Sequence, residues 1–325
     1  MIITGKSKIA SVLRDPKTWV KSPAFENDVQ KWSGRVKGLI LGFCMAVVIV
    51  GVCYIILSPI FGIISRAIMH PDDLVNPLVF LIPRTFTMDN IRFALQYMVY
   101  WRTLAMTLGF AIGFSVLHVI VTSMVGYGFA RFKFPGSGVL FAFVIVTIVV
   151  PVQSYMVPMF LNFRFFLGTN VSLLNSVWAL GLLTLTGVGL RSGLYIYIFR
   201  QFFRGLPKEI EEAAFIDGAG SFYTYVKVMM PNAVPAIVTV LLFSFVWHYN
   251  DTFYTGLLMS NINLMSTRLS ALGLTFSTME VVHSPSIIQM VVFAGVMLAI
   301  LPILIIYMFL QRYFVEGLER SGIVG

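Results

Sequence analysis

Six long apolar runs, separated by shorter polar segments, organise this chain. They occupy roughly residues 38–64, 103–127, 138–161, 176–199, 233–254 and 288–310. A run of about 20 apolar residues is long enough for a helix to cross the core of a bilayer. The pattern therefore predicts an all-α integral membrane protein with six transmembrane helices. The first run exceeds the bilayer thickness, so we expect its helix to tilt or to project from the membrane.

The polar segments divide the chain into three parts. Residues 1–37 form a basic N-terminal segment, residues 38–310 form one membrane domain, and residues 311–325 form a C-terminal tail. Within the membrane domain, the segment 200–232 is a polar interval between the fourth and fifth apolar runs. The segment 65–102 holds several prolines and aspartates, which mark turns, and its residues 89–100 predict a short interfacial helix.

Composition agrees with a membrane protein. Hydrophobic residues make up 58% of the 325 residues and charged residues 11%, whereas soluble domains carry about a quarter charged residues. The mean hydropathy is +0.87. These values exclude an ordinary soluble domain.

The net charge of +9 could indicate nucleic-acid binding, but its distribution follows the membrane instead. With the N-terminus inside, six spans place 16 of the 23 basic residues on the inner side, including all nine lysines. This is the positive-inside rule. It predicts that the segment 200–232 and both termini lie in the cytosol, and we expect no nucleic-acid partner.

The segment 200–232 carries its own helix signals. Pro207 suits the first helical position, and the three glutamates that follow suit the positive end of a helix dipole. Asp217 and Gly218 end this helix, because glycine adopts the left-handed conformation at little cost. A second helix is expected to start near Ser221 and to stop before Pro231. The sequence thus predicts two helices joined by a turn outside the membrane.

The spacing within this segment resembles the EAA loop of binding-protein-dependent ABC transporter permeases. The matching residues are, in order, Glu212, Ala213, Ala214, Gly218, Val228, Met230 and Pro231. Valine and methionine stand where the family pattern has isoleucine and leucine.

The flanking segments resemble the carbohydrate-type, maltose-permease-like members of that family. They are the stretches 130–136 (ARFKFPG), 200–203 (RQFF), 249–253 (YNDTF) and 311–318 (QRYFVEGL). Position 249 departs from the family pattern, with tyrosine in place of tryptophan. The resemblance covers about residues 95–325 and leaves residues 1–37 unexplained.

The resemblance implies the fold of a type I ABC importer permease, in which the EAA loop is a coupling helix. That helix docks on a separate ATP-hydrolysing subunit and moves with it, so that two permeases switch between inward-facing and outward-facing states. Carried over to this chain, the expected ATPase-coupling residues are Glu209, Glu212, Ala213, Ala214, Asp217, Gly218, Ala219 and Pro231.

The resemblance also implies partners and a location. We expect a second permease, two cytosolic ATP-binding subunits and an extracellular solute-binding protein, in a bacterial cytoplasmic membrane. A heterodimer of two different permeases is expected, with a homodimer as the alternative. The tripeptide 5–7 (GKS) lacks the glycine that a phosphate-binding loop requires five residues earlier. We therefore expect no ATPase activity, no catalytic residue and no bound cofactor in this chain, with ATP and Mg held by the partner subunits.

Candidate residues for a solute path lie in the fourth and fifth runs. Arg191 lies midway along the fourth run, where a charge is costly and tends to face a polar cavity. It is expected to line the path or to bond to a partner helix. Trp247, Tyr249, Asn250 and Asp251 cluster near the outer end of the fifth run. Such aromatic and polar groups suit a sugar, but they equally suit an interfacial belt or a contact for the binding protein.

Other classes have less support in the sequence. A proton-coupled carrier would need membrane acids, and only Asp251 is a candidate. An intramembrane enzyme would need paired carboxylates or a nucleophile motif, and neither is present. His118 and His248 are single histidines in different runs without metal-ligand spacing, so structural roles are expected and no metal is predicted. An oligosaccharide or related glycoside is the expected solute, with a glycerol-phosphate-like solute as the alternative.

Overall fold

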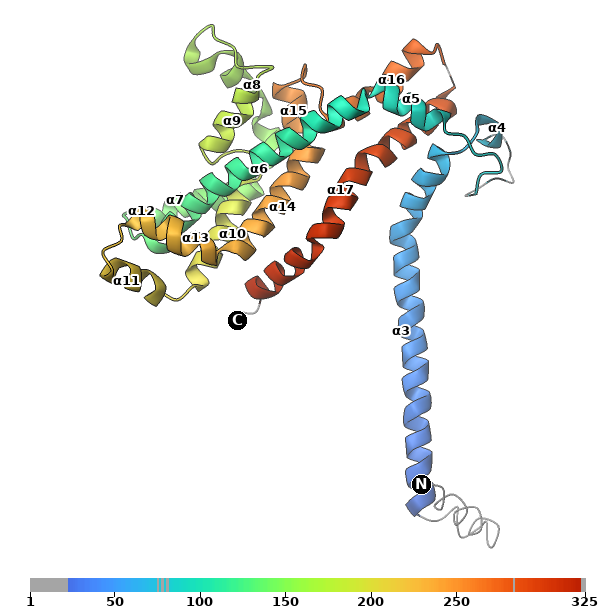
Figure 1. Ribbon diagram of the computed structural model, residues 1–325, viewed down its shortest axis with the longest axis horizontal. Helices are drawn as coiled ribbons and strands as arrows, with labels where there is room; N and C mark the ends of the chain where they lie inside the picture. Colours follow the sequence, from blue (N-terminus) through green and yellow to red (C-terminus); the bar gives the residue numbers. More distant parts are fainter. Residues whose placement is uncertain (1–22, 75, 77–78, 80–81, 283, 323–325) are drawn as a thin grey trace. The chain divides into compact units, whose positions relative to one another are not determined.

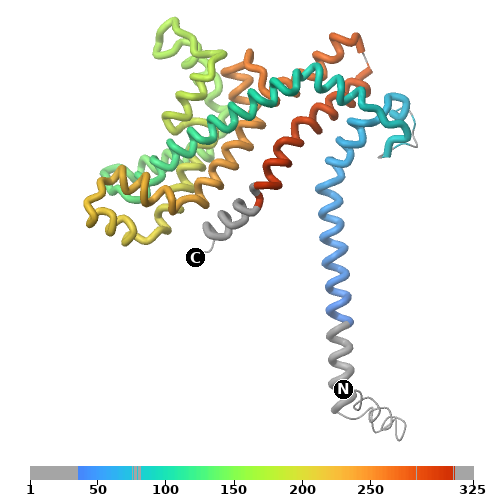
Figure 2. Tube along the Cα trace, viewed as in Figure 1, coloured from blue at the N-terminus to red at the C-terminus, as the bar shows by residue number. Residues whose placement is uncertain are grey.

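The computed structural model describes residues 23–322 except for 75, 77–78, 80–81 and 283 (Figures 1 and 2). The first 22 residues of the basic segment and the last three of the tail lie outside the described residues. The chain divides into two compact units, residues 1–62 and residues 63–325. Each unit is described by itself below.

Helix α3 (Pro23–Ala67) makes up the described part of the first unit and continues to residue 67. Its portion Val36–Ala67 is apolar along 32 residues. The side chains of residues 36–57 are all exposed. A helix that is apolar all round suits a lipid environment rather than water. The first predicted span is therefore confirmed as a helix, which begins well inside the segment 1–37.

The second unit is built around helix α6 (Tyr100–Arg131). Helices α10 (Ser192–Gly205) and α14 (Val234–Asn250) both pack along α6, and α17 (Pro285–Gly322) packs on α14 and on α16 (Met265–Met279) (Figure 1). Hydroxyl side chains buried in α6 donate to carbonyl groups of the same helix, as Thr107 does to Thr103 O at 2.7 Å. These hydroxyl groups of α6 thereby have hydrogen-bond partners without water.

Two glycines allow close helix packing in this unit. A Cβ atom added at Gly126 of α6 would lie 2.6 Å from Cβ of Phe199 in α10. A Cβ atom at Gly193 of α10 would lie 2.9 Å from the carbonyl oxygen of Val144 in α7 (Ser137–Val149). Larger residues would push the helices apart, so glycine fixes these helix–helix contacts.

The predicted span 138–161 is not one straight helix. Helix α7 is followed by η1 (Val152–Tyr155) and α8 (Met156–Arg164), and the path bends by 102° between them. The cause is Pro151, because proline drives the preceding residue out of the helical region. The backbone of Val150 is indeed extended.

The predicted span 176–199 is likewise not one continuous helix. It consists of α9 (Val177–Leu185) and α10, separated by a turn at residues 186–191. Gly187 has a φ angle of +74° and Arg191 a φ angle of +60°, both in the left-handed region. A helix cannot continue through such residues.

The fifth predicted span is close to the observed helix, because α14 covers residues 234–250 of the expected 233–254. Among the described residues, three helices are long and apolar enough to cross a membrane. They are Val36–Ala67, Tyr100–Arg131 and Pro285–Phe309. The number rises to five if each of two bent helix pairs counts as one span. These pairs are Ser137–Val149 with Val152–Arg164 and Ser221–Asn232 with Val234–Asn250. The structure thus supports three to five of the six predicted spans by length and composition.

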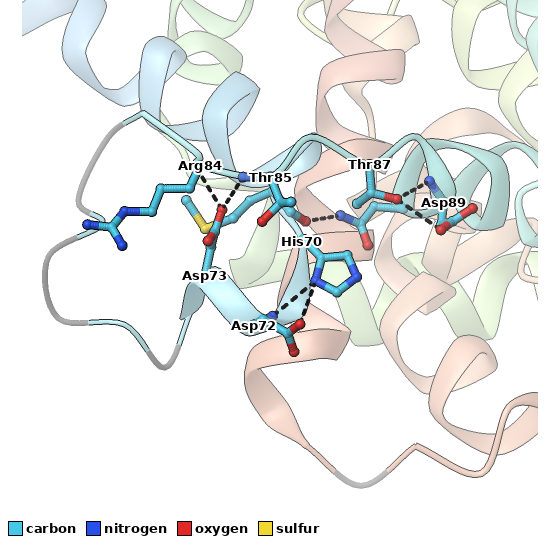
Figure 3. A network of polar contacts seen from close by, with 9 residues as sticks. His70, Asp72, Asp73, Arg84, Thr85, Thr87 and Asp89 are labelled. Atoms are coloured by element: carbon cyan, nitrogen blue, oxygen red, sulfur yellow. Dashed lines mark hydrogen bonds and ion pairs between the residues drawn. The ribbon is translucent and has the colours of Figure 1, made fainter.

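A polar network stabilises the segment before α6 (Figure 3). Oδ2 of Asp73 accepts the backbone N–H groups of Arg84 and Thr85, both at 2.8 Å. These hydrogen bonds, with that of Thr85 the strongest, lower the pKa of Asp73 below its usual value. Asp73 lies in α4 (Pro71–Leu74), and the network leads to α5 (Asp89–Tyr97), which confirms the short helix predicted there.

The second unit has two ends (Figure 1). The segment that contains helix α11 (Glu209–Ile216) lies at the same end as the C-terminal end of α17. Helices α8, α15 (Phe253–Leu258) and α16 lie at the opposite end. Segments that the charge pattern places on one side of a membrane therefore lie at one end of the unit.

Candidate functional site

An exposed corner of the second unit is formed by α11 and the glycine that follows it. The helix starts with three acids in its first turn and ends at Asp217. Gly218 has a φ angle of +82°, and its N–H donates to the carbonyl oxygen of Phe215 at 3.0 Å. The predicted helix and its glycine end are both confirmed, but the helix begins at Glu209 and not at Pro207.

The predicted coupling residues lie mostly on the surface of this corner. Exposed are Glu209, Glu212, Ala213, Asp217, Gly218 and Pro231, and partly buried are Ala214 and Ala219. The structure thus places seven of the eight predicted residues, those from Glu209 to Ala219, together on one helix and its turn. Pro231 lies apart from them, beyond the next helical segment.

The second helix of the segment differs from its prediction. It starts at Ser221 as expected, with α12 (Ser221–Thr224), but continues through η3 (Tyr225–Met229) into α13 (Met230–Asn232). The expected stop before Pro231 is wrong. The η3 segment is a π-helical turn, in which the N–H of Met230 reaches the carbonyl oxygen of Tyr225. Pro231 follows at the start of α13, where a missing N–H is tolerated.

A buried ion pair ties this corner to α6. Nε of Arg131 lies 2.7 Å from Oε2 of Glu211, and both side chains are only 8% exposed. The hydroxyl group of Tyr127 donates to Oε1 of Glu211 at 2.6 Å, and Nη2 of Arg131 donates to Leu206 O at 2.9 Å. A displacement of α11 would therefore act directly on the end of α6.

Sequence reasoning assigned Glu211 only a role at the helix dipole and missed this pair. Arg131 lies in the motif 130–136, so the signal was an arginine just after one apolar run and an acid in the polar segment that follows another. Nothing in the sequence spacing brings these two residues together, because they are 80 positions apart.

Exposed apolar side chains on both sides of Gly218 in the sequence, here called the apolar patch, were also missed. The apolar patch consists of Phe215, Ile216, Phe222 and Tyr223, with Ile216 86% and Phe222 71% exposed. Contiguous exposed apolar side chains mark sites of protein or membrane contact. The available signal was the presence of four large apolar residues around an Asp-Gly turn in an otherwise polar segment.

A cavity of about 1010 Å³ lies at the breaks between the helices. Its walls come from the linker between α7 and α8, from the turn before α10, and from the junction of α14 with α15. Arg191, Trp247, Asn250 and Asp251 line it, as do Gln153, Tyr155 and Asn162. Four of the five predicted pathway residues are thus brought together by the fold.

Arg191 and Trp247 contact each other in this cavity. Cζ of Arg191 lies 4.3 Å from the centroid of the Trp247 ring, which is cation–π geometry. Arg191 precedes α10 at the turn, not within a continuous helix as the sequence suggested. The left-handed backbone at this position directs its exposed side chain to the cavity wall.

Asp251 and Tyr249 have structural partners. The carboxylate of Asp251 accepts the backbone N–H groups of Tyr254 at 3.2 Å and Thr255 at 2.7 Å, which caps α15. Tyr249 is buried and is not among the cavity's lining residues; its hydroxyl group donates to Ala299 O in α17 at 2.9 Å. The helical period explains the difference, because Trp247 and Asn250 share one face of α14 and Tyr249 does not, while Asp251 directly follows the helix.

The two histidines, which the sequence treats as separate, lie together in the core. The rings of His118 and His248 are 5.0 Å apart between centroids. His118 contacts Ser192 Oγ at 3.0 Å through Nε2, and His248 contacts Ser244 O at 2.8 Å through Nδ1. Within the described ranges no group of three or more potential metal ligands is found.

Comparison with protein families gives one match that covers most of the chain. Residues 119–320 match the family described as "Binding-protein-dependent transport system inner membrane component". The matched region includes α11, the Arg131–Glu211 pair and all residues of the cavity.

Individual relatives are similar over most of the chain. The chain is 30% identical to the alpha-glucoside transport system permease protein of Rhizobium meliloti, across 75% of this chain and 62% of that protein. It thus spans less than two thirds of that relative. It is 26% identical to the arabinooligosaccharides transport system permease protein of Halalkalibacterium halodurans, across 88% of this chain and 98% of that one.

A solved structure shares the fold. It is the crystal structure of a bacterial ABC transporter involved in the import of the acidic polysaccharide alginate. The TM-score is 0.65 at 24% sequence identity, with 85% of this chain and 96% of the other chain covered. At this identity the similarity establishes the fold alone.

Proposed function

This chain belongs to the family of binding-protein-dependent transport system inner membrane components, and we propose that it is the permease subunit of an ATP-driven sugar importer. In this proposal it forms part of the path for a sugar or oligosaccharide that an extracellular binding protein delivers. The relatives named for alpha-glucosides and arabinooligosaccharides support a saccharide solute.

The observation that carries the proposal is the exposed corner at Gly218. An exposed helix that presents Glu209, Glu212 and Ala213 to the outside, with large apolar side chains beside it, suits docking into a cleft on another protein. The buried Arg131–Glu211 pair supports transmission, because it joins that docking surface to α6. ATP-binding subunits that close on ATP would move α11, and α6 would move with it.

The proposed topology has six membrane spans, with both termini in the cytosol. The third span is the bent pair of α7 and α8, the fourth is formed by α9 and α10 across their turn, and the fifth is α14. The distribution of lysines and arginines supports this orientation. The common location of α11 and the end of α17 is consistent with it (Figure 1).

The partners follow from the family and from the docking surface. We assign the chain to a complex with a second, different permease, two cytosolic ATP-binding subunits and a solute-binding protein. ATP and Mg belong to the ATP-binding subunits, and this chain acts without a cofactor of its own. Its location is the bacterial cytoplasmic membrane.

The cavity is assigned to the solute path. Arg191, Trp247 and Asn250 present polar and aromatic groups there, while Asp251 holds the junction of α14 and α15. Tyr249 contributes packing between α14 and α17 instead.

Uptake by proteoliposomes tests the proposal. The complex of this chain with the second permease and the ATP-binding subunits, supplied with the binding protein, is expected to take up labelled maltotriose or arabinotriose when ATP is enclosed. Uptake should cease in vesicles that lack the ATP-binding subunits and should persist with an uncoupler. Uptake without ATP that an uncoupler abolishes would instead identify an ion-coupled carrier.

A non-sugar polar solute is the alternative within the same class. ATP-dependent uptake of glycerol phosphate, with no uptake of either trisaccharide, would replace the sugar assignment and leave the ATP-driven mechanism in place.

A further inference from the structure

The cavity contains one charged group that is free to meet a ligand. Among its lining residues, only Arg191 and Asp251 carry a formal charge. Asp251 is buried, and both of its carboxylate oxygens already accept backbone N–H groups. Its negative charge is therefore engaged in capping α15.

The Arg191 side chain is exposed, and its contact is with a ring face. Within the part of the chain that the structure describes, its guanidinium group has no hydrogen bond or ion pair. Cζ of Arg191 lies over the Trp247 ring, 4.3 Å from its centroid. A cation–π contact of this kind uses none of the guanidinium N–H donors. These donors can bind a carboxylate in bidentate geometry.

The surrounding walls suit a saccharide. Tyr155 adds an exposed aromatic surface, and the amides of Gln153, Asn162 and Asn250 offer donors and acceptors for hydroxyl groups. The rest of the lining is mostly apolar, so an opposite charge in the cavity is screened less than at an open surface.

We propose that the solute is an acidic saccharide, with a uronate carboxylate bound by the guanidinium edge of Arg191 as the sugar passes Trp247. This inference rests on the proposed function and narrows its solute class. A neutral saccharide would leave the arginine donors of the cavity without an acceptor, which disfavours it relative to a uronate.

The test compares two trisaccharides in the reconstituted complex with its binding protein. Uptake of trigalacturonate and of maltotriose is measured for the wild type and for Arg191→Gln and Arg191→Lys. The ratio of trigalacturonate uptake to maltotriose uptake is expected to fall at least about tenfold in Arg191→Gln, the loss expected for a charge-assisted hydrogen bond. Lysine keeps the charge but not the bidentate geometry, so its ratio should be intermediate.

Arg164→Gln is the matched control. Arg164 is also exposed and also lies over an aromatic ring, 5.8 Å from the centroid of Phe165, but it does not line the cavity. The uptake ratio of this variant should equal that of the wild type.

Three outcomes would overturn the inference. A wild-type complex that carries maltotriose and not trigalacturonate contradicts the acidic class while sustaining the importer. An equal loss of uptake for both saccharides in Arg191→Gln would mean that Arg191 serves packing or contact with the second permease. Uptake of neither saccharide in the presence of ATP would contradict the sugar importer itself, and this inference with it.

Discussion

Replacement of Gly218 by proline is expected to reduce ATP-dependent uptake to below about a tenth of the wild-type rate, while the chain stays in the membrane. Proline fixes φ near −65° and has no N–H. Gly218 needs a φ angle of +82° and donates its N–H to Phe215 O. The substitution therefore destroys the turn that ends α11 and displaces the docking corner.

The effect should be confined to the backbone of the corner. No atom lies within 4 Å of a Cβ atom added at Gly218, so a side chain there meets open space. Gly218→Asn is the matched control, because asparagine tolerates the left-handed conformation, and it should retain most of the uptake. Uptake, solute-stimulated ATPase activity and the amount of protein in the membrane are measured together. Normal uptake and normal stimulation in Gly218→Pro would contradict the role of the corner.

Glu212→Lys probes the same surface without altering the backbone. Glu212 is exposed, so the reversed charge acts on a docking partner rather than on the fold of this chain. We expect it to abolish uptake as well.

Removing the charge of Glu211 is expected to cause the second large effect. In Glu211→Gln, Arg131 keeps a buried positive charge with no carboxylate partner, which typically costs about 3–5 kcal/mol. The complex should lose thermal stability, and it should hydrolyse more ATP for each solute molecule carried, because α11 is no longer held to α6.

A double-mutant cycle separates this pair from general damage. Arg131→Gln combined with Glu211→Gln replaces the ion pair by two neutral amides and should recover part of the stability that either single variant loses. Asp89→Asn is the control, because Asp89 pairs with Arg92 at 3.2 Å in an exposed position. Such a surface pair contributes about 0–1 kcal/mol. The proposed linkage would be contradicted if the losses of stability in Arg131→Gln and Glu211→Gln were strictly additive. A loss of stability in Glu211→Gln as small as that in Asp89→Asn would also contradict it.

The local features of the coupling corner could be predicted from the sequence. Pro207, the acids that follow it and Gly218 act within a few residues of one another, so they determine a short helix and its end. The cluster at 247–251 was found for the same reason, although the helical period already separates Tyr249 from Trp247 and Asn250.

Features that depend on tertiary contacts could not be predicted. The pairing of Arg131 with Glu211 requires the packing of α6 against the segment 200–232, which no local pattern encodes. The bends in the third and fourth apolar runs had visible causes in Pro151 and in Gly187. The spans were assigned from apolar content alone, which measures transfer to lipid and takes no account of the backbone angles that these two residues impose.

Photo-crosslinking from Ile216 tests the central claim most directly. A benzophenone amino acid at Ile216 is expected to crosslink to the ATP-binding subunit in the assembled complex, because this side chain is the most exposed of the apolar patch beside Gly218. Leu274 in α16 is 75% exposed and lies at the opposite end of the unit, so the same amino acid there should give no such product. Absence of the product at Ile216, or an equal yield at Leu274, would contradict the account.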